Sequence, residues 1–217
     1  RRQRQMCIRD SISILVVVMV STVTRGHQDQ GLIASPQDNA TVLSTPEHID
    51  LFAPFDLDGF GPEAEAVVRA GIGLFDEAGL SLPPIRVVHC DDPRECFDRD
   101  GATVHRAEGP EVRLCTDQVT PMFEWVVIHE LAHCWDRHVL TDEVRQAFLD
   151  LRGLDGWRDG AWHERGAEHA AEIMVWGLID RPVRPGHIDQ NSCDELEAGY
   201  VTLTGQAPLH GYRDVCG

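Results

Sequence analysis

The stretch that decides the fold is "WVVIHELAHCWD", residues 125–136, in which two histidines and a glutamate interrupt an apolar run. An α-helix turns by about 100° per residue, so His129 and His133 project from one face, one turn apart. That spacing lets both imidazoles bind one metal ion. Glu130 stands about 100° away, where it can reach a water on the ion without replacing it. We therefore expect a metal-binding helix with Glu130 as general base.

The elements around this stretch can be predicted from caps and periodicity. Thr120 is a good N-cap, Pro121 suits the first turn, and Glu124 follows them. The other expected elements are a helix at 62–78, a strand at 85–90, a hairpin of "ATVHR" (102–106) and "EVRLC" (111–115), a helix at 142–151, and a long helix at 161–179. This order predicts an α+β fold.

A catalytic zinc site needs a third protein ligand and one open position. The metzincin continuation of the motif fails, because Asp136 and Val139 stand where it requires glycine and histidine. The helix "AWHERGAEHAAEIMVWGL" (161–178) offers Glu164, Glu168 and Glu172 at four-residue spacing on one face. We expect an acid of this helix to complete the site.

Together these motifs resemble the gluzincin metallopeptidases, and "WHERGAEHAAE" is similar to the surroundings of the third ligand in small single-domain bacterial members. The resemblance covers about residues 85–179. It implies that Zn²⁺ is bound by His129, His133 and Glu168, and that Glu172 orients a ligand histidine. It also implies a small zincin-like fold, with a short twisted sheet whose edge strand, expected at "EVRLC", lies beside the active-site helix.

Rival ligands remain open at this point. A shift of one turn would make Glu164 the ligand and Glu168 its support. His169 points about 100° away from Glu168, which favours a place on the helix surface or behind the ligands. A cysteine ligand would have to be Cys115 or Cys134, and disulfide pairing would remove its thiolate.

Hydrolysis also needs a donor that stabilises the oxyanion opposite the metal. The candidates are Tyr200, His210, Tyr212 and His105. Trp157 and Trp162 precede the second motif helix, so they could line a substrate subsite or serve as core anchors.

Four segments organise the chain. Residues 1–25 have an arginine-rich start and a short apolar run, the layout of a signal peptide, although "RQRQMCIRDS" resembles translated adapter sequence and part of this end could be artefactual. The apolar run is about half the roughly 20 residues that a membrane span needs. We expect an extended lead-in at 26–60, a zincin-like domain at 61–182, and a loop-rich, disulfide-stapled tail at 183–217.

Six cysteines remain when Cys7 is set aside, which favours disulfides in an exported chain. The expected pairs are Cys90 with Cys96, Cys115 with Cys134, and Cys193 with Cys216. The net charge of -17, with arginine as the only long cation, argues against nucleic acid or an anionic membrane as partner.

The expected function is a secreted zinc-dependent peptide hydrolase, an endopeptidase, acting on a peptide or protein substrate. One alternative is a secreted binding or structural domain that keeps the zinc site without turnover. A zinc amidase acting on cell-wall peptides is another. Glu130 favours an enzyme, because a purely structural site has no use for a base and closes its fourth position.

Overall fold

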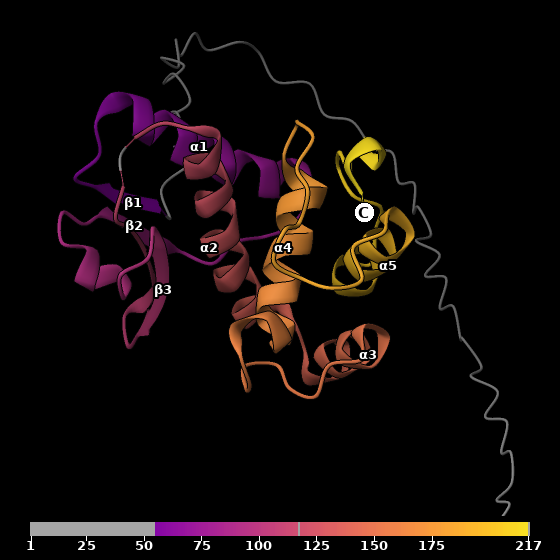
Figure 1. Ribbon diagram of the computed structural model, residues 1–217. Helices are drawn as coiled ribbons and strands as arrows, with labels where there is room; N and C mark the ends of the chain where they lie inside the picture. The colour runs from indigo at the N-terminus through magenta and orange to yellow at the C-terminus, as the bar shows by residue number, and fades with distance from the viewer. Residues whose placement is uncertain (1–54, 117, 217) are drawn as a thin grey trace, which may run out of the picture. The chain divides into compact units, whose positions relative to one another are not determined.

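A computed structural model describes residues 55–116 and 118–216 as a mixed α/β fold with a four-stranded sheet and five α-helices (Figure 1). The expected segment at 1–25 and residues 26–54 of the lead-in expected at 26–60 lie outside the described residues. The strands are β1 (Phe55–Asp58), β2 (Ile85–His89), β3 (Gly101–Arg106) and β4 (Gly109–Leu114). The helices are α1 (Pro62–Glu77), α2 (Pro121–Val139), α3 (Asp142–Arg152), α4 (Gly166–Leu178) and α5 (Cys193–Thr204), with short 3₁₀ turns at Pro93–Cys96, Trp162–Glu164 and Arg213–Val215. None of these helices is long and apolar enough to cross a membrane.

The sheet has the strand order β1-β2-β4-β3, with β3 antiparallel to β4 and the other pairs parallel. The edge strand beside the motif helix is therefore β3, and the expectation that "EVRLC" forms that edge is wrong. Val112 and Leu114 of β4 are fully buried, as suits a central strand, whereas Thr103 and His105 of β3 are half-buried. Strand β1 forms where we expected a loosely ordered lead-in, and Phe55 and Leu57 alternate there with exposed aspartates.

Helix α2 begins as expected, with the Thr120 hydroxyl accepting a hydrogen bond from the Phe123 N–H. It packs against the sheet and α1 on one side and against α4 on the other (Figure 1). Every residue of α4 is buried, so this helix is enclosed on all sides rather than on one face. Its buried Glu168, His169 and Glu172 are thereby held inside the protein.

The tail expected to be loop-rich contains helix α5, which begins at a capping box. The Ser192 hydroxyl and backbone N–H both donate to the Glu195 carboxylate, at 2.6 and 3.1 Å. Helix α5 lies against α4 at Gly177, where a Cβ atom would stand 2.3 Å from the Tyr200 ring. That close approach places the Tyr200 ring in the core, with no exposed surface.

The described residues form two disulfides, of which only Cys193–Cys216 was expected. The second joins Cys96 to Cys115, because the turn at Pro93–Cys96 folds back against the end of β4. Cys90 and Cys134 are buried free thiols, so the pairs proposed for them are wrong. Disulfides are typical of proteins in oxidising compartments.

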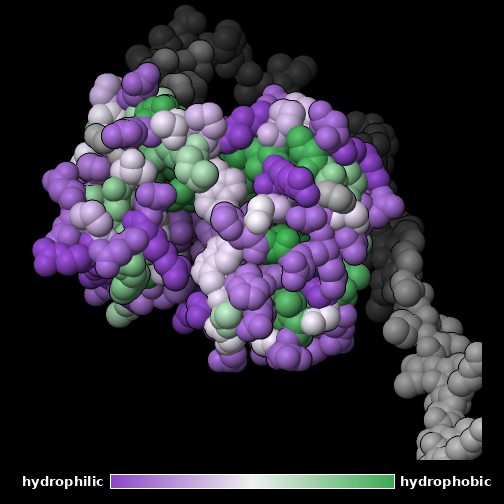
Figure 2. Space-filling view, in the orientation of Figure 1, coloured by the Kyte–Doolittle hydropathy of each residue, from purple (hydrophilic) through white to green (hydrophobic). Residues whose placement is uncertain are grey.

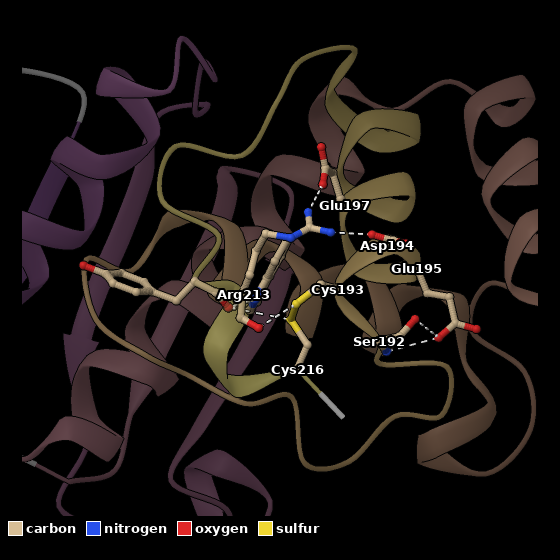
Figure 3. The surroundings of a disulfide bond; sticks show 9 residues. Ser192, Cys193, Asp194, Glu195, Glu197, Arg213 and Cys216 are labelled. Carbon is tan, nitrogen blue, oxygen red and sulfur yellow. Dashed lines mark hydrogen bonds and ion pairs between the residues drawn. A yellow bond between two sulfur atoms is a disulfide. The ribbon is translucent and has the colours of Figure 1, made fainter.

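The Cys193–Cys216 bond ties the end of the chain to the first turn of α5, and Arg213 beside it pairs with Asp194 and Glu197 (Figure 3). We expect the double variant Cys193→Ser/Cys216→Ser to unfold at lower urea concentration, with a loss of about 3 kcal/mol, because the bond closes a loop of 23 residues. The matched control is Cys90→Ser, which removes a thiol without opening a loop. Equal unfolding midpoints for the double variant and the wild type would contradict this role.

Candidate metal centre

Three side chains from two helices converge on one point. The Nε2 atoms of His129 and His133 on α2 lie 3.2 Å apart. The Glu168 Oε2 atom on α4 lies 3.2 Å from the first and 3.4 Å from the second. His129 and Glu168 are buried and His133 is half-buried, so the cluster sits within the protein with limited access to water.

These distances can be compared with what a metal ion requires. Ligands about 2.0–2.1 Å from a tetrahedral zinc ion stand about 3.3 Å from one another. The three distances agree with that value, and two imidazoles with one carboxylate form a donor set that zinc uses in catalytic sites. The larger ion Ca²⁺ prefers oxygen ligands at about 2.3–2.6 Å. The described residues therefore fit zinc or a similar transition metal.

Aromatic rings pack against the cluster at His129. The Trp125 ring stacks on His129 with centroids 4.6 Å apart, and the Trp162 ring lies nearly parallel to it at 6.1 Å. Burial lowers the pKa of His129, which favours the neutral imidazole that a metal needs. Burial alone would raise the pKa of Glu168, but its contacts with the two imidazoles keep that pKa below its usual range. Glu168 is therefore anionic, as a metal ligand would have to be.

Glu130 lies next to this cluster and is held by strand β3. The Thr103 Oγ1 atom lies 2.8 Å from Glu130 Oε2 and 2.9 Å from its backbone oxygen. On the same strand, a Cβ atom at Gly101 would stand 2.6 Å from Val126 and 3.0 Å from the Glu130 side chain. Glycine at this position thus leaves room for the carboxylate, and sequence reasoning identified neither Thr103 nor Gly101.

A cavity of about 750 Å³ opens over the cluster. Its floor includes His129, Glu130 and His133 of α2, and its walls come from β3 on one side and from residues 158–168 on the other. The space-filling view shows the surface hollowed between the sheet and α4, within a mainly hydrophilic face (Figure 2). Trp162 lines this cavity, whereas Trp157 packs edge-on against Phe148.

The tail residues suggested as oxyanion donors lie elsewhere. Tyr200 is fully buried against α4, the Tyr212 hydroxyl donates to Asp180, and His210 lies 3.4 Å from the same aspartate. None of the three lines the cavity over the cluster. Tyr200 lies in α5, whose contacts with α4 are outside this cavity, and His210 and Tyr212 lie beside Asp180.

His105 is the oxyanion candidate that does line the cavity. Burial and the nearby positive charges of Arg137, Arg158 and His133 lower its pKa to about 4, so it carries a neutral N–H at pH 7. Arg158, Arg165 and His187 also line the cavity and were missed. Nothing in their local sequence indicated it, although Arg165 lies within the segment that resembles the small gluzincins.

The rival ligands all lie outside the cluster. The exposed Glu164 accepts a hydrogen bond from the Ala161 N–H and so caps the turn before α4. His169 is buried rather than on the surface, with Nε2 2.8 Å from the His163 carbonyl. Cys115 is in a disulfide, and burial raises the pKa of the Cys134 thiol to about 12. Among the four, none belongs to the ligand cluster.

Glu172 lies one turn beyond Glu168 and is 1% exposed. Neither of its carboxylate oxygens has a hydrogen-bond partner among the described residues, and neither does the buried Nδ1 atom of His129. The expected role of Glu172 in orienting a ligand histidine stays a prediction. Burial and the charge of Glu168 raise the pKa of Glu172 to about 8.

This raised pKa predicts a pH-dependent stability in the metal-free protein. Between pH 4.5 and about 8 the folded state holds a proton at Glu172 that the unfolded chain releases, so the free energy of unfolding falls as pH rises. The neutral variant Glu172→Gln should be more stable than wild type at pH 8 by on the order of 3 kcal/mol, and equally stable near pH 4. Urea unfolding with chelator at both pH values measures this, with the exposed Glu164→Gln as control. If the free energy of unfolding of Glu172→Gln varied with pH as that of the wild type does, protonation of Glu172 would not be the cause.

Comparisons with known proteins do not identify a relative: no protein-family model, curated protein or solved structure matches this chain. The functional assignment therefore depends on the site itself.

Proposed function

We propose that this chain is a secreted zinc-dependent peptide hydrolase with a zincin-like fold of gluzincin type. The observation that carries the proposal is the convergence of His129, His133 and Glu168 at 3.2–3.4 Å, with Glu130 beside them on the floor of an open cavity. A structural zinc site is closed by a fourth protein ligand, whereas this cluster of three faces a cavity.

Zinc held by two imidazoles and a carboxylate supplies, when bound, a Lewis acid and an activated water nucleophile. Glu130 accepts the proton of the attacking water at its carboxylate and then delivers it to the leaving amine. Thr103 holds one oxygen of that carboxylate by a hydrogen bond of 2.8 Å. His105, neutral at pH 7, donates its N–H toward the oxygen that becomes negative. Hydrolysis then proceeds without a covalent enzyme intermediate.

Substrate is aligned by strand β3 in this proposal. One edge of β3 pairs with β4 along Gly101–Arg106, and no described strand pairs with its other edge. An extended peptide can add to such an edge through backbone hydrogen bonds. Because β3 also lines the cavity, a peptide bound there would run past the metal ligands. Secretion is supported by the two disulfides, which need an oxidising compartment to form.

The test is the zinc content of the oxidised protein together with cleavage of a mixed peptide library. We expect one zinc per chain and cleavage that a chelator stops and added zinc restores. Zinc without cleavage would favour the binding or structural domain. Cleavage of cell-wall peptides alone would favour the amidase, and absence of zinc would overturn the metal site.

A further inference from the structure

The walls of the cavity carry three arginines, Arg99, Arg158 and Arg165, although the whole chain has a net charge of -17. Arg99 precedes strand β3, and the other two belong to the opposite wall. In a protein with so many more acids than bases, three arginines around one cavity are more than its composition predicts.

Elsewhere in the described residues, most arginines are paired with carboxylates. Arg86, Arg106 and Arg113 all contact Glu111, and Arg213 contacts two acids. Among the described residues, neither Arg99 nor Arg165 has a carboxylate within ion-pair distance.

Arg158 is only loosely engaged. Its single ion pair is a 3.8 Å contact with Asp136. That carboxylate already accepts hydrogen bonds from Arg145 at 3.2 Å and from the Trp157 indole at 3.1 Å. Arg165 donates its Nε–H to the Gly160 carbonyl at 3.0 Å, which leaves its terminal N–H groups without a partner among the described residues. The cavity arginines therefore have donors to spare for a ligand.

The charges inside the cavity do not cancel these arginines. A bound zinc ion would be balanced by the carboxylates of Glu130 and Glu168. Asp100 is the other acid that lines the cavity, so the three arginines exceed the remaining acids. Of the other titratable groups there, His105 is neutral, and His129, His133 and His187 add no negative charge.

The arginines also flank the metal ligands from two ends. Gly101, two residues after Arg99, packs against Val126, which precedes His129 on α2. Arg158 contacts Asp136, which follows His133 on the same helix. A peptide lying along β3 would thus pass a cation on each side of the ligand cluster.

We infer that this cavity selects peptides that carry a carboxylate near the bond placed over the metal site, held by Arg158 and Arg165 on one wall and Arg99 at the other end. Guanidinium groups bind carboxylates through paired N–H donors, which suits both Asp or Glu side chains and a peptide C-terminus. The role of these arginines in substrate recognition rests on the proposed function. The binding of carboxylate peptides does not depend on turnover.

The experiment uses the full, zinc-loaded chain in its Glu130→Gln form, so that probes are bound and not cut. Four matched pools of fluorescein-labelled hexapeptides serve as probes, with Asp and Glu either kept or replaced by Asn and Gln, and with a free or an amidated C-terminus. Dissociation constants come from fluorescence anisotropy. We expect the pools that carry carboxylates to bind roughly 10- to 100-fold more tightly than the amidated pool of Asn and Gln peptides, which is the gain expected from hydrogen bonds to charged groups. If the dissociation constant changes with the Asp and Glu side chains, these side chains supply the carboxylate. If it changes with amidation, the C-terminus supplies it.

Variants test which arginines are responsible. Arg158→Gln and Arg165→Gln should each remove most of the carboxylate preference, and Arg165→Lys should restore part of it. Arg69→Gln is the matched control, since Arg69 is exposed on α1, pairs with Glu65 and does not line the cavity. Equal binding of the four pools, no binding of any pool, or an unchanged preference in both glutamine variants would overturn the inference. Carboxylate-dependent binding without cleavage by wild type would uphold it and overturn the hydrolase instead.

Discussion

Glu130→Gln should lower the rate of peptide hydrolysis by about 10³-fold while the protein retains one zinc ion per chain. General acid–base catalysis contributes roughly 10²–10⁴-fold, and this variant removes the only group in our proposal that moves protons. Glutamine has the same shape and can still accept a hydrogen bond from Thr103, which lies 2.8 Å from the carboxylate. The metal cluster on His129, His133 and Glu168 is untouched.

The measurement compares initial rates on one peptide with zinc content by mass spectrometry in the same samples. Glu164→Gln is the matched control, because that glutamate is exposed and caps the turn before α4. The control should keep wild-type activity. Full activity in Glu130→Gln would refute its role as base, whereas loss of zinc in that variant would show that Glu130 supports the metal and not the proton transfer.

Loss of a ligand should have an equally large effect, on zinc itself. Structural zinc sites bind with about 10–16 kcal/mol over four ligands, so one ligand accounts for roughly 3 kcal/mol, or about 10²-fold in affinity. We expect His133→Ala and Glu168→Ala each to lose at least this much, because their atoms form two corners of the cluster. Competition with a fluorescent zinc chelator measures the affinity directly.

The matched control is Glu164→Ala, one turn earlier in the chain than Glu168. It should bind zinc as wild type does, since its carboxylate is occupied by the Ala161 N–H. A Glu168→Ala protein that still holds one zinc per chain, together with zinc loss in Glu164→Ala, would reverse the assignment. Unfolding by urea in the presence of chelator checks that neither alanine variant has merely lost its fold.

Features that depend on neighbouring residues were predictable. Helix α2 begins at Pro121 after its Thr120 cap, and the four-residue spacing placed His129 and His133 together. The α+β composition was confirmed in its coarse form, with a small sheet and several helices. The start of α4 was placed too early, because backbone bonds from Gly166 and Ala167 to residues 156 and 157 hold the preceding segment outside the helix.

The sequence by itself determined the motif helix and the placement of His129, Glu130 and His133 on it, because caps and helical periodicity act within one or two turns. It narrowed the third ligand to one helix. The tertiary structure decided that Glu168 and not Glu164 reaches the cluster, that β3 is the edge strand, and that Cys96 pairs with Cys115. It also moved Tyr200 into the core and brought arginines from distant segments around the metal ligands. Each of these depends on which segments far apart in the chain come to lie side by side, and the burial of apolar surface that drives this is not encoded at any single position.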